Sequence, residues 1–127
     1  VRGNGKRKLV VFADPNCGYC KRFEKDLQKL DNVTIHHVLY PILGEDSKVK
    51  SKNIWCAKDK AKTWNDWMLG GVTPPAASCD TAGIDANVEF GKKHRITGTP
   101  TLFFADGTRV VGAVPLSQIE SQLAQVK

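Results

Sequence analysis

The 127-residue sequence has no long apolar run, which argues against a membrane-spanning segment within it. A helix that crosses a bilayer needs roughly 20 consecutive apolar residues. The longest apolar stretches here, Leu9–Ala13 and Thr101–Ala105, have the length of single strands. A hydrophobic fraction of 41% and a charged fraction of 25% are instead typical of one ordinary globular domain.

Aromatic residues are also scarce, at 8%, and they do not alternate with basic residues as in a protein that stacks on single-stranded nucleic acid. The formal net charge is +6, but the Lys and Arg residues are spread over positions 6–8, 21–29, 48–62 and 92–95. We therefore expect no nucleic-acid partner. We interpret the basic residues as a solvated surface that would attract acidic, unfolded polypeptides.

The N-terminus lacks both an initiator methionine and the pattern of a signal peptide. Residues 1–8 combine Gly, Asn and a basic run, which is typical of a linker. We expect residues 1–8 to be a linker, residues 9–127 to be the domain, and the chain to be a mature or truncated piece of a longer protein.

Hydrophobic periodicity predicts the order β-α-β, a helical stretch, then β-β-α. This order favours an α/β fold in which a mixed central sheet is flanked by helices and carries a helical insertion. The expected strands cover residues 8–13, 33–39, 101–105 and 108–112. Helices are expected to begin at Cys17 and at Ser117 and to cover Ser47–Leu69 and Ile84–Arg95. The stretch Ser47–Leu69 is either one long helix or two shorter ones, capped by Asp46 or Ser47 and ended by Gly70-Gly71.

Four cysteines divide into two unlike pairs. Cys17 and Cys20 form a C-x-x-C motif, whereas Cys56 and Cys79 lie far apart in the sequence. This asymmetry predicts one reactive pair and one structural disulfide, and therefore an oxidising compartment. A Cys56–Cys79 disulfide would stabilise the fold by about 3 kcal/mol in the chain-entropy model. A second redox pair is the alternative.

Thiol–disulfide exchange needs an attacking thiolate and a second thiol close enough to resolve the mixed disulfide. At a helix start, unpaired backbone N–H groups and the helix dipole stabilise a thiolate, and Lys21 and Arg22 add positive charge. Cys20 lies one turn deeper. Our hypothesis is that Cys17 faces solvent and attacks, while Cys20 resolves.

Residues of these types also serve three other functions in proteins. A zinc site would need two more ligands near the motif, and the adjacent His36 and His37 point to opposite faces of a strand. A cysteine hydrolase using Cys17 with His36, His37 or His94 lacks a local signature. We expect no metal and no cofactor. A peptide-binding or chaperone module with secondary redox activity stays open.

Four segments together resemble the DsbC/DsbG family of bacterial periplasmic disulfide isomerases. They are Val10–Cys20, Ile54–Lys60, Pro75–Asp80 and Gly98–Thr101. The resemblance implies a thioredoxin-like fold and a periplasmic location. It further implies that Pro100 is a cis-proline beside the cysteine pair and that Thr99 exposes its backbone to an extended substrate. Gly18 and Tyr19 between the cysteines are similar to the isomerase branch.

The resemblance also implies an activity: reduction or reshuffling of disulfides in unfolded or wrongly bridged secreted proteins, with a membrane reductase of DsbD type keeping the pair reduced. Family members carry an N-terminal dimerisation domain, so we expect a homodimer only if such a domain exists outside this chain. Thioredoxins place a buried aspartate where this sequence has Val11. Asp14 is either an acid–base helper or a turn former before Pro15.

Overall fold

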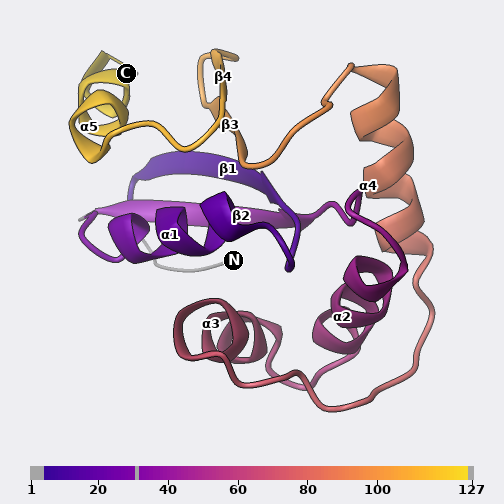
Figure 1. Ribbon diagram of the computed structural model, residues 1–127. Coiled ribbons are helices and arrows are strands. Elements are labelled where there is room, and N and C mark those ends of the chain that lie inside the picture. Colours follow the sequence, from indigo (N-terminus) through magenta and orange to yellow (C-terminus); the bar gives the residue numbers. More distant parts are fainter. Residues whose placement is uncertain (1–4, 31, 126–127) are drawn as a thin grey trace.

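The computed structural model describes residues 5–30 and 32–125 of the chain (Figure 1). In chain order the elements are β1 (Arg7–Ala13), α1 (Gly18–Leu27), β2 (Val33–Leu39), α2 (Glu45–Trp55), α3 (Lys60–Gly70), α4 (Ala82–Lys93), β3 (Thr101–Phe104), β4 (Arg109–Val111) and α5 (Leu116–Gln125). Residues 1–4 of the expected linker lie outside the described residues. Arg7 and Lys8, which the linker was expected to include, already belong to β1.

The four strands form one mixed sheet in the order β2-β1-β3-β4. β1 pairs in parallel with β2 and antiparallel with β3, and β3 continues antiparallel to β4. The parallel pair requires a crossover, which α1 provides. From Leu9 to Ala13, β1 is an unbroken apolar run because, as an inner strand, it is covered on both faces. The predicted fold class, a mixed sheet flanked by helices, is confirmed.

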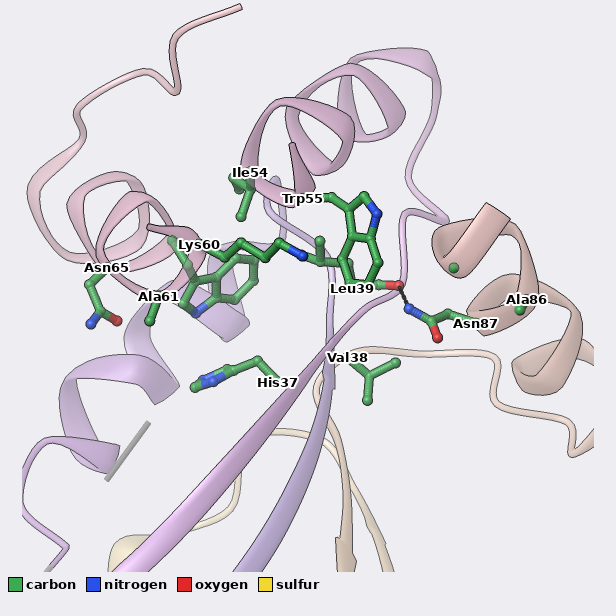
Figure 2. Close-up of a pocket in the computed structure, with 12 residues that line it drawn as sticks. His37, Val38, Leu39, Ile54, Trp55, Lys60, Ala61, Asn65, Ala86 and Asn87 are labelled. Carbon is green, nitrogen blue, oxygen red and sulfur yellow. Dashed lines mark hydrogen bonds between the residues drawn. The ribbon is translucent and has the colours of Figure 1, made fainter. Parts of the chain in front are cut away.

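Each face of the sheet has its own core. Helices α1, α3 and α5 contribute to the larger one, built from Leu9, Val11, Phe23, Leu27, Ile35, Trp64, Met68, Leu102, Ile119 and Leu123, among others. On the other face, Phe12, Tyr40 and Ile96 pack with Val88 of α4. Helix α4 is tied to β2 by Asn87, whose Nδ2 donates to the Leu39 carbonyl at 3.1 Å (Figure 2).

The close approach of α4 to the sheet depends on one glycine. A Cβ at Gly91 would overlap the ring of Tyr40. Tyr40 is buried, and its hydroxyl donates to the Ile96 carbonyl at 2.6 Å. The ring therefore has no room to move, and any side chain at position 91 would force α4 away from the sheet.

The helical insertion consists of two helices rather than one. Asp59 caps α3 by accepting from the Lys62 N–H at 3.1 Å, and Gly71, at φ 69°, ends it as expected. The expected cap of α2 was wrong: the capping position is Gly44, and Asp46 and Ser47 lie in the first turn. The Ser47 hydroxyl is instead used in a buried hydrogen bond described below. α5 begins at Leu116, one residue before Ser117.

None of the helices in the described part of the chain is both long and apolar enough to cross a membrane.

Candidate active site

The C-x-x-C motif straddles the start of α1, as the sequence predicted. β1 ends at Ala13, and the Asp14-Pro15-Asn16 turn delivers Cys17 to the capping position of the helix. The Cys17 side chain acts as the cap, because its Sγ accepts a hydrogen bond from the Cys20 N–H at 3.1 Å. A thiolate at this position is stabilised by the unpaired N–H groups and the positive end of the helix dipole.

Cys17 does not face solvent, and here the expectation from the sequence was wrong. Its side chain is buried, with a relative exposure of 5%, and Cys20 has 1%. The cause is the loop around Thr99, since the Cys17 thiol lies 3.5 Å from the Thr99 carbonyl oxygen, to which it donates. The Thr99–Pro100 peptide bond is cis, the geometry that the family resemblance implied.

The two residues between the cysteines lie at the surface. Tyr19 is 62% exposed, and the guanidinium of Arg22 lies over its ring, 4.7 Å from the centroid. A Cβ added to Gly18 would meet no atom within 4 Å. Gly18 and Tyr19 therefore form an exposed segment directly after the buried Cys17.

Burial also changes the acidity of the Cys20 thiol. Desolvation raises the pKa of the Cys20 thiol far above its ordinary value, and the hydrogen bond with the Cys17 side chain raises it further. Cys20 is therefore held as a neutral thiol while the pair is reduced. That Cys17 attacks and Cys20 resolves stays a prediction.

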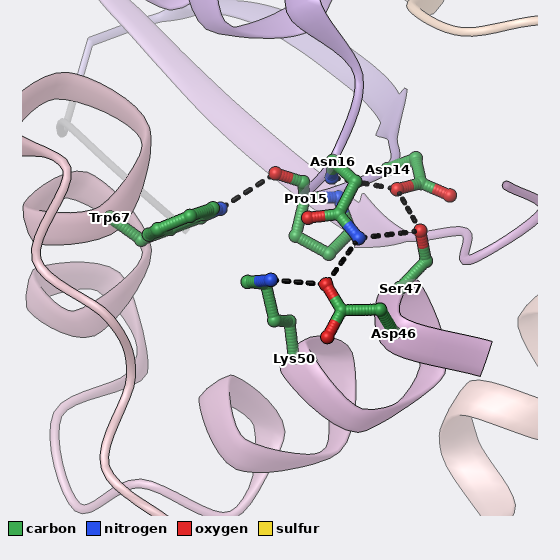
Figure 3. A network of polar contacts seen from close by, with 7 residues as sticks. All are labelled: Asp14, Pro15, Asn16, Asp46, Ser47, Lys50 and Trp67. Carbon is green, nitrogen blue, oxygen red and sulfur yellow. Dashed lines mark hydrogen bonds and ion pairs between the residues drawn. The ribbon is translucent and has the colours of Figure 1, made fainter. Parts of the chain in front are cut away.

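A buried carboxylate holds the turn that leads to Cys17 (Figure 3). Asp14 is fully buried and accepts four hydrogen bonds. Its Oδ1 accepts from the Asn16 N–H at 2.8 Å and the Ser47 hydroxyl at 2.7 Å. Its Oδ2 accepts from the Ile42 and Leu43 N–H groups at 2.8 and 2.9 Å. Asp14 is therefore a turn former that also ties the motif to α2 and to the loop before it.

Trp67 supports the same turn from α3. Its Nε1 donates to the Pro15 carbonyl at 2.6 Å, and the ammonium groups of Lys21 and Lys50 lie 4.1 and 4.8 Å from its ring centroid. Lys50 is also paired with Asp46 (Figure 3). The sequence analysis did not assign this role to Trp67. Its position in the predicted helical stretch Ser47–Leu69 indicated only core packing, and nothing in the local spacing shows which carbonyl an indole reaches.

The other two cysteines form the predicted disulfide. Cys56 and Cys79 are bonded with a Cα–Cα distance of 5.5 Å, which links the turn after α2 to the connector before α4. Their sulfurs are therefore not available to complete a zinc site with Cys17 and Cys20. Among residues 5–30 and 32–125 no group of three or more His, Cys, Asp or Glu side chains is arranged to hold a metal ion.

His36 and His37 occupy opposite faces of β2, as expected for neighbours on a strand. His37 faces α1 and α3: its Nε2 lies 2.6 Å from Oε1 of the buried Glu24, and its ring centroid lies 5.5 Å from that of Trp64. In the described part of the chain neither histidine forms a hydrogen bond with Cys17, whose sulfur contacts the Thr99 carbonyl and the Cys20 N–H instead, so the arrangement does not resemble the cysteine–histidine pair of a hydrolase.

Comparison with known proteins agrees with this geometry. The thioredoxin-like domain family matches residues 1–127. The probable thiol:disulfide interchange protein DsbC of Bordetella pertussis is 48% identical over 123 residues, which is 97% of this chain and 44% of that protein. DsbC of Escherichia coli K12 is 34% identical over 122 residues, 93% of this chain and 51% of that protein. The chain thus spans about half the length of these curated relatives.

Among solved structures, a disulfide interchange protein from Neisseria gonorrhoeae superposes with a TM-score of 0.90 at 38% identity, covering 98% of this chain and 91% of that one. The catalytic domain of Proteus mirabilis ScsC gives a TM-score of 0.71 at 27% identity, covering 98% and 87%. The chain belongs to the thioredoxin-like domain family. Within it, the chain is similar in sequence to thiol:disulfide interchange proteins named DsbC.

Proposed function

We propose that this chain is the catalytic domain of a thiol–disulfide oxidoreductase and isomerase, with Cys17 and Cys20 as its redox pair. The observation that carries the proposal is the position of the Cys17 sulfur. It caps α1, accepts from the Cys20 N–H, and lies against the carbonyl of Thr99 before the cis-proline. That position combines stabilisation of a thiolate with a backbone carbonyl beside it, just before β3.

The first step is attack by the Cys17 thiolate on one sulfur of a substrate disulfide. The substrate S–S bond breaks, a mixed disulfide with Cys17 forms, and the other substrate sulfur leaves as a thiolate. The backbone of Thr99 is suited to pair with the extended substrate chain, which would align its sulfur with Cys17. The hydrogen bonds of Asp14 and Trp67 fix the turn before Cys17 and so limit how far the sulfur moves.

The mixed disulfide then has two fates. If a third substrate thiolate attacks the substrate sulfur of the mixed disulfide, a new substrate disulfide forms and Cys17 leaves as a thiolate, which is isomerisation; attack by the freed thiolate only restores the original disulfide. If Cys20 loses its proton and attacks the Cys17 sulfur, a Cys17–Cys20 disulfide forms, the substrate leaves reduced, and the protein is oxidised by two electrons. Because burial raises the pKa of Cys20, the second route is slowed and the first is favoured.

The similarity to DsbC proteins also supports a proposal about where the domain works and on what. We infer that the domain works in the bacterial periplasm on wrongly bridged secreted proteins, and that a membrane reductase of DsbD type returns the pair to the dithiol. A homodimer would require a dimerisation domain outside this chain. These inferences rest on the similarity to DsbC proteins and on the Cys56–Cys79 disulfide, which suits an oxidising compartment.

Reduction of insulin and reactivation of scrambled ribonuclease test the proposal on the reduced chain. Cys17→Ala is expected to abolish both. The double variant Cys56→Ala/Cys79→Ala is the matched control and is expected to retain both, because it removes two cysteines without touching the motif. If Cys17→Ala reactivates scrambled substrate as well as the wild type does, the domain is a chaperone or peptide-binding module and the redox assignment is wrong.

A further inference from the structure

Two cationic side chains follow the cysteine motif on α1, and each lies over an aromatic ring. The ammonium of Lys21 lies 4.1 Å from the centroid of the Trp67 ring, and the guanidinium of Arg22 lies 4.7 Å from the centroid of the Tyr19 ring. A cation over the face of an aromatic ring is attracted by the ring quadrupole. Both charges therefore have preferred positions, and both belong to the first turns of α1, directly after Cys20.

The two rings place these charges beside the cysteine pair. The Trp67 indole donates, at 2.6 Å, to a carbonyl of the turn that leads to Cys17, so the ammonium of Lys21 lies next to that turn (Figure 3). Tyr19 lies between the two cysteines and is exposed, so the guanidinium of Arg22 lies at the surface of the motif itself. A substrate cysteine that bonds to Cys17 therefore brings its neighbouring residues close to both charges.

Neither charge is neutralised by a carboxylate in the described part of the chain. The ion pairs there involve other basic residues, namely Arg7, His37, Lys48, Lys50 and Lys62. Lys50 also lies over the Trp67 ring, but its charge is offset by Asp46. The sulfur of Cys17 contacts the Cys20 N–H and the Thr99 carbonyl, so it is not bonded to either cation. Lys21 and Arg22 thus remain available to act on an approaching substrate.

The sign of this charge matters because the attacking group in thiol–disulfide exchange is a thiolate. An acidic side chain next to a substrate disulfide repels the thiolate of a free thiol, and a basic side chain attracts it. The cysteine pair differs from a free thiol because two positive charges lie beside it. Relative to a free thiol, it should therefore react faster when the substrate is acidic and slower when the substrate is basic.

We propose that Lys21 and Arg22 make the cysteine pair selective for disulfides that are flanked by acidic side chains. The proposal rests on the exchange function proposed above and names the class of substrate that the site prefers. The bonds made and broken are those of the first exchange step: the Cys17 thiolate bonds to one substrate sulfur, and the other leaves as a thiolate.

Coulomb's law sets the size of the preference. When a flanking charge comes within roughly 8 Å of each cation in water, the two attractions together speed the attack about fourfold at 10 mM salt. At 150 mM salt the Debye length is about 8 Å, and the gain falls to about twofold. A basic flanking residue should slow the attack by the same factors.

The test measures attack by the reduced whole chain on three peptide disulfides that carry Glu, Gln or Lys directly after the cysteine. Samples are quenched by acid and analysed by mass spectrometry, at 10 and 150 mM salt. Each rate constant is divided by that of 2-mercaptoethanol with the same peptide, which removes the intrinsic reactivity of the disulfide and the repulsion by a thiolate. The corrected rates should follow the order Glu, Gln, Lys, with steps of about fourfold at low salt and about twofold at high salt.

Variants separate the effect of charge from that of packing. Lys21→Gln/Arg22→Gln should remove most of the preference, whereas Lys21→Arg/Arg22→Lys keeps both charges and should retain it. Lys29→Gln is the matched control, because it removes one charge from an exposed lysine beyond the C-terminal end of α1, and it should also retain the preference.

Two results would overturn the proposal while leaving the exchange function intact. The first is equal corrected rates for the Glu and Lys peptides with the wild-type chain. The second is a loss of preference in Lys29→Gln as large as in the double glutamine variant. No attack on any of the three peptides would overturn the exchange function, and this proposal with it.

Discussion

The fully buried carboxylate of Asp14 offers the sharpest test of how the turn before Cys17 is held. We consider Asp14→Asn, which keeps the shape of the side chain but replaces one acceptor oxygen with an NH₂ donor. All four of its partners donate to it in the native structure. Three of these are backbone N–H groups, which cannot become acceptors.

The best orientation of the new amide follows from that set. The amide oxygen must face the Ile42 and Leu43 N–H groups. In the opposite orientation the NH₂ group, which is a donor, would face these two backbone N–H donors. The NH₂ then faces Ser47, whose hydroxyl can rotate to accept, and the Asn16 N–H, which loses its acceptor. A hydrogen bond to a charged group contributes about 1.5–3 kcal/mol, and the remaining bonds are weakened by loss of the charge. We expect a loss of about 3 kcal/mol in the free energy of unfolding.

Urea denaturation of the reduced chain at pH 7, followed by tryptophan fluorescence, measures this loss. Asp26→Asn is the matched control: it removes the same charge at a half-buried site on α1 and should change stability by less than about 0.5 kcal/mol. A loss below about 1 kcal/mol for Asp14→Asn, or equal losses for the two variants, would refute the reasoning that the carboxylate organises this turn.

Three further outcomes follow. Gly91→Ala should destabilise the fold by about 2 kcal/mol or more, because the new Cβ overlaps the Tyr40 ring. Gly70→Ala is the control: its Cβ makes only an ordinary contact with Val72, so it should be neutral or slightly stabilising. Thermal unfolding of both variants measures the difference. Trp67→Phe removes the indole hydrogen bond to the turn before the motif and should cost about 1 kcal/mol in urea denaturation. Finally, the raised pKa of Cys20 keeps its proton in the folded state above about pH 9, where the unfolded thiol has lost it. The reduced chain should therefore lose about 1.4 kcal/mol of stability per pH unit there, and the Cys20→Ala variant should lack this slope.

Much of the fold could be predicted because its signals are local. The apolar run of β1, the breaker at Pro15 and the helical spacing after Cys17 each report their own element, and Gly71 ends α3 as an αL residue should. The spacing of the cysteines likewise predicted the C-x-x-C motif and the separate Cys56–Cys79 pair. These features are set within a few residues of the chain.

What could not be predicted depends on contacts between distant segments. Cys17 is covered by the Thr99 carbonyl, 82 residues away, so its burial is not a property of the helix start. Asp14 accepts hydrogen bonds from the Ser47 hydroxyl in α2 and from the Ile42 and Leu43 N–H groups in the loop before α2. The role of Trp67 depends on which carbonyl its indole reaches. Side-chain periodicity gives the buried face of a helix, but it does not give the partner atom on the neighbouring element.

The central claim, that Cys17 is the attacking sulfur and Cys20 the resolving one, is tested most directly by trapping the mixed disulfide. Reduced Cys20→Ala and Cys17→Ala chains are each mixed with a disulfide-bonded substrate, quenched by acid and analysed by mass spectrometry without reductant. The account predicts that Cys20→Ala accumulates a covalent adduct at Cys17 and that Cys17→Ala forms none. An adduct at Cys20 in the Cys17→Ala chain, formed as fast as the adduct at Cys17, would contradict it.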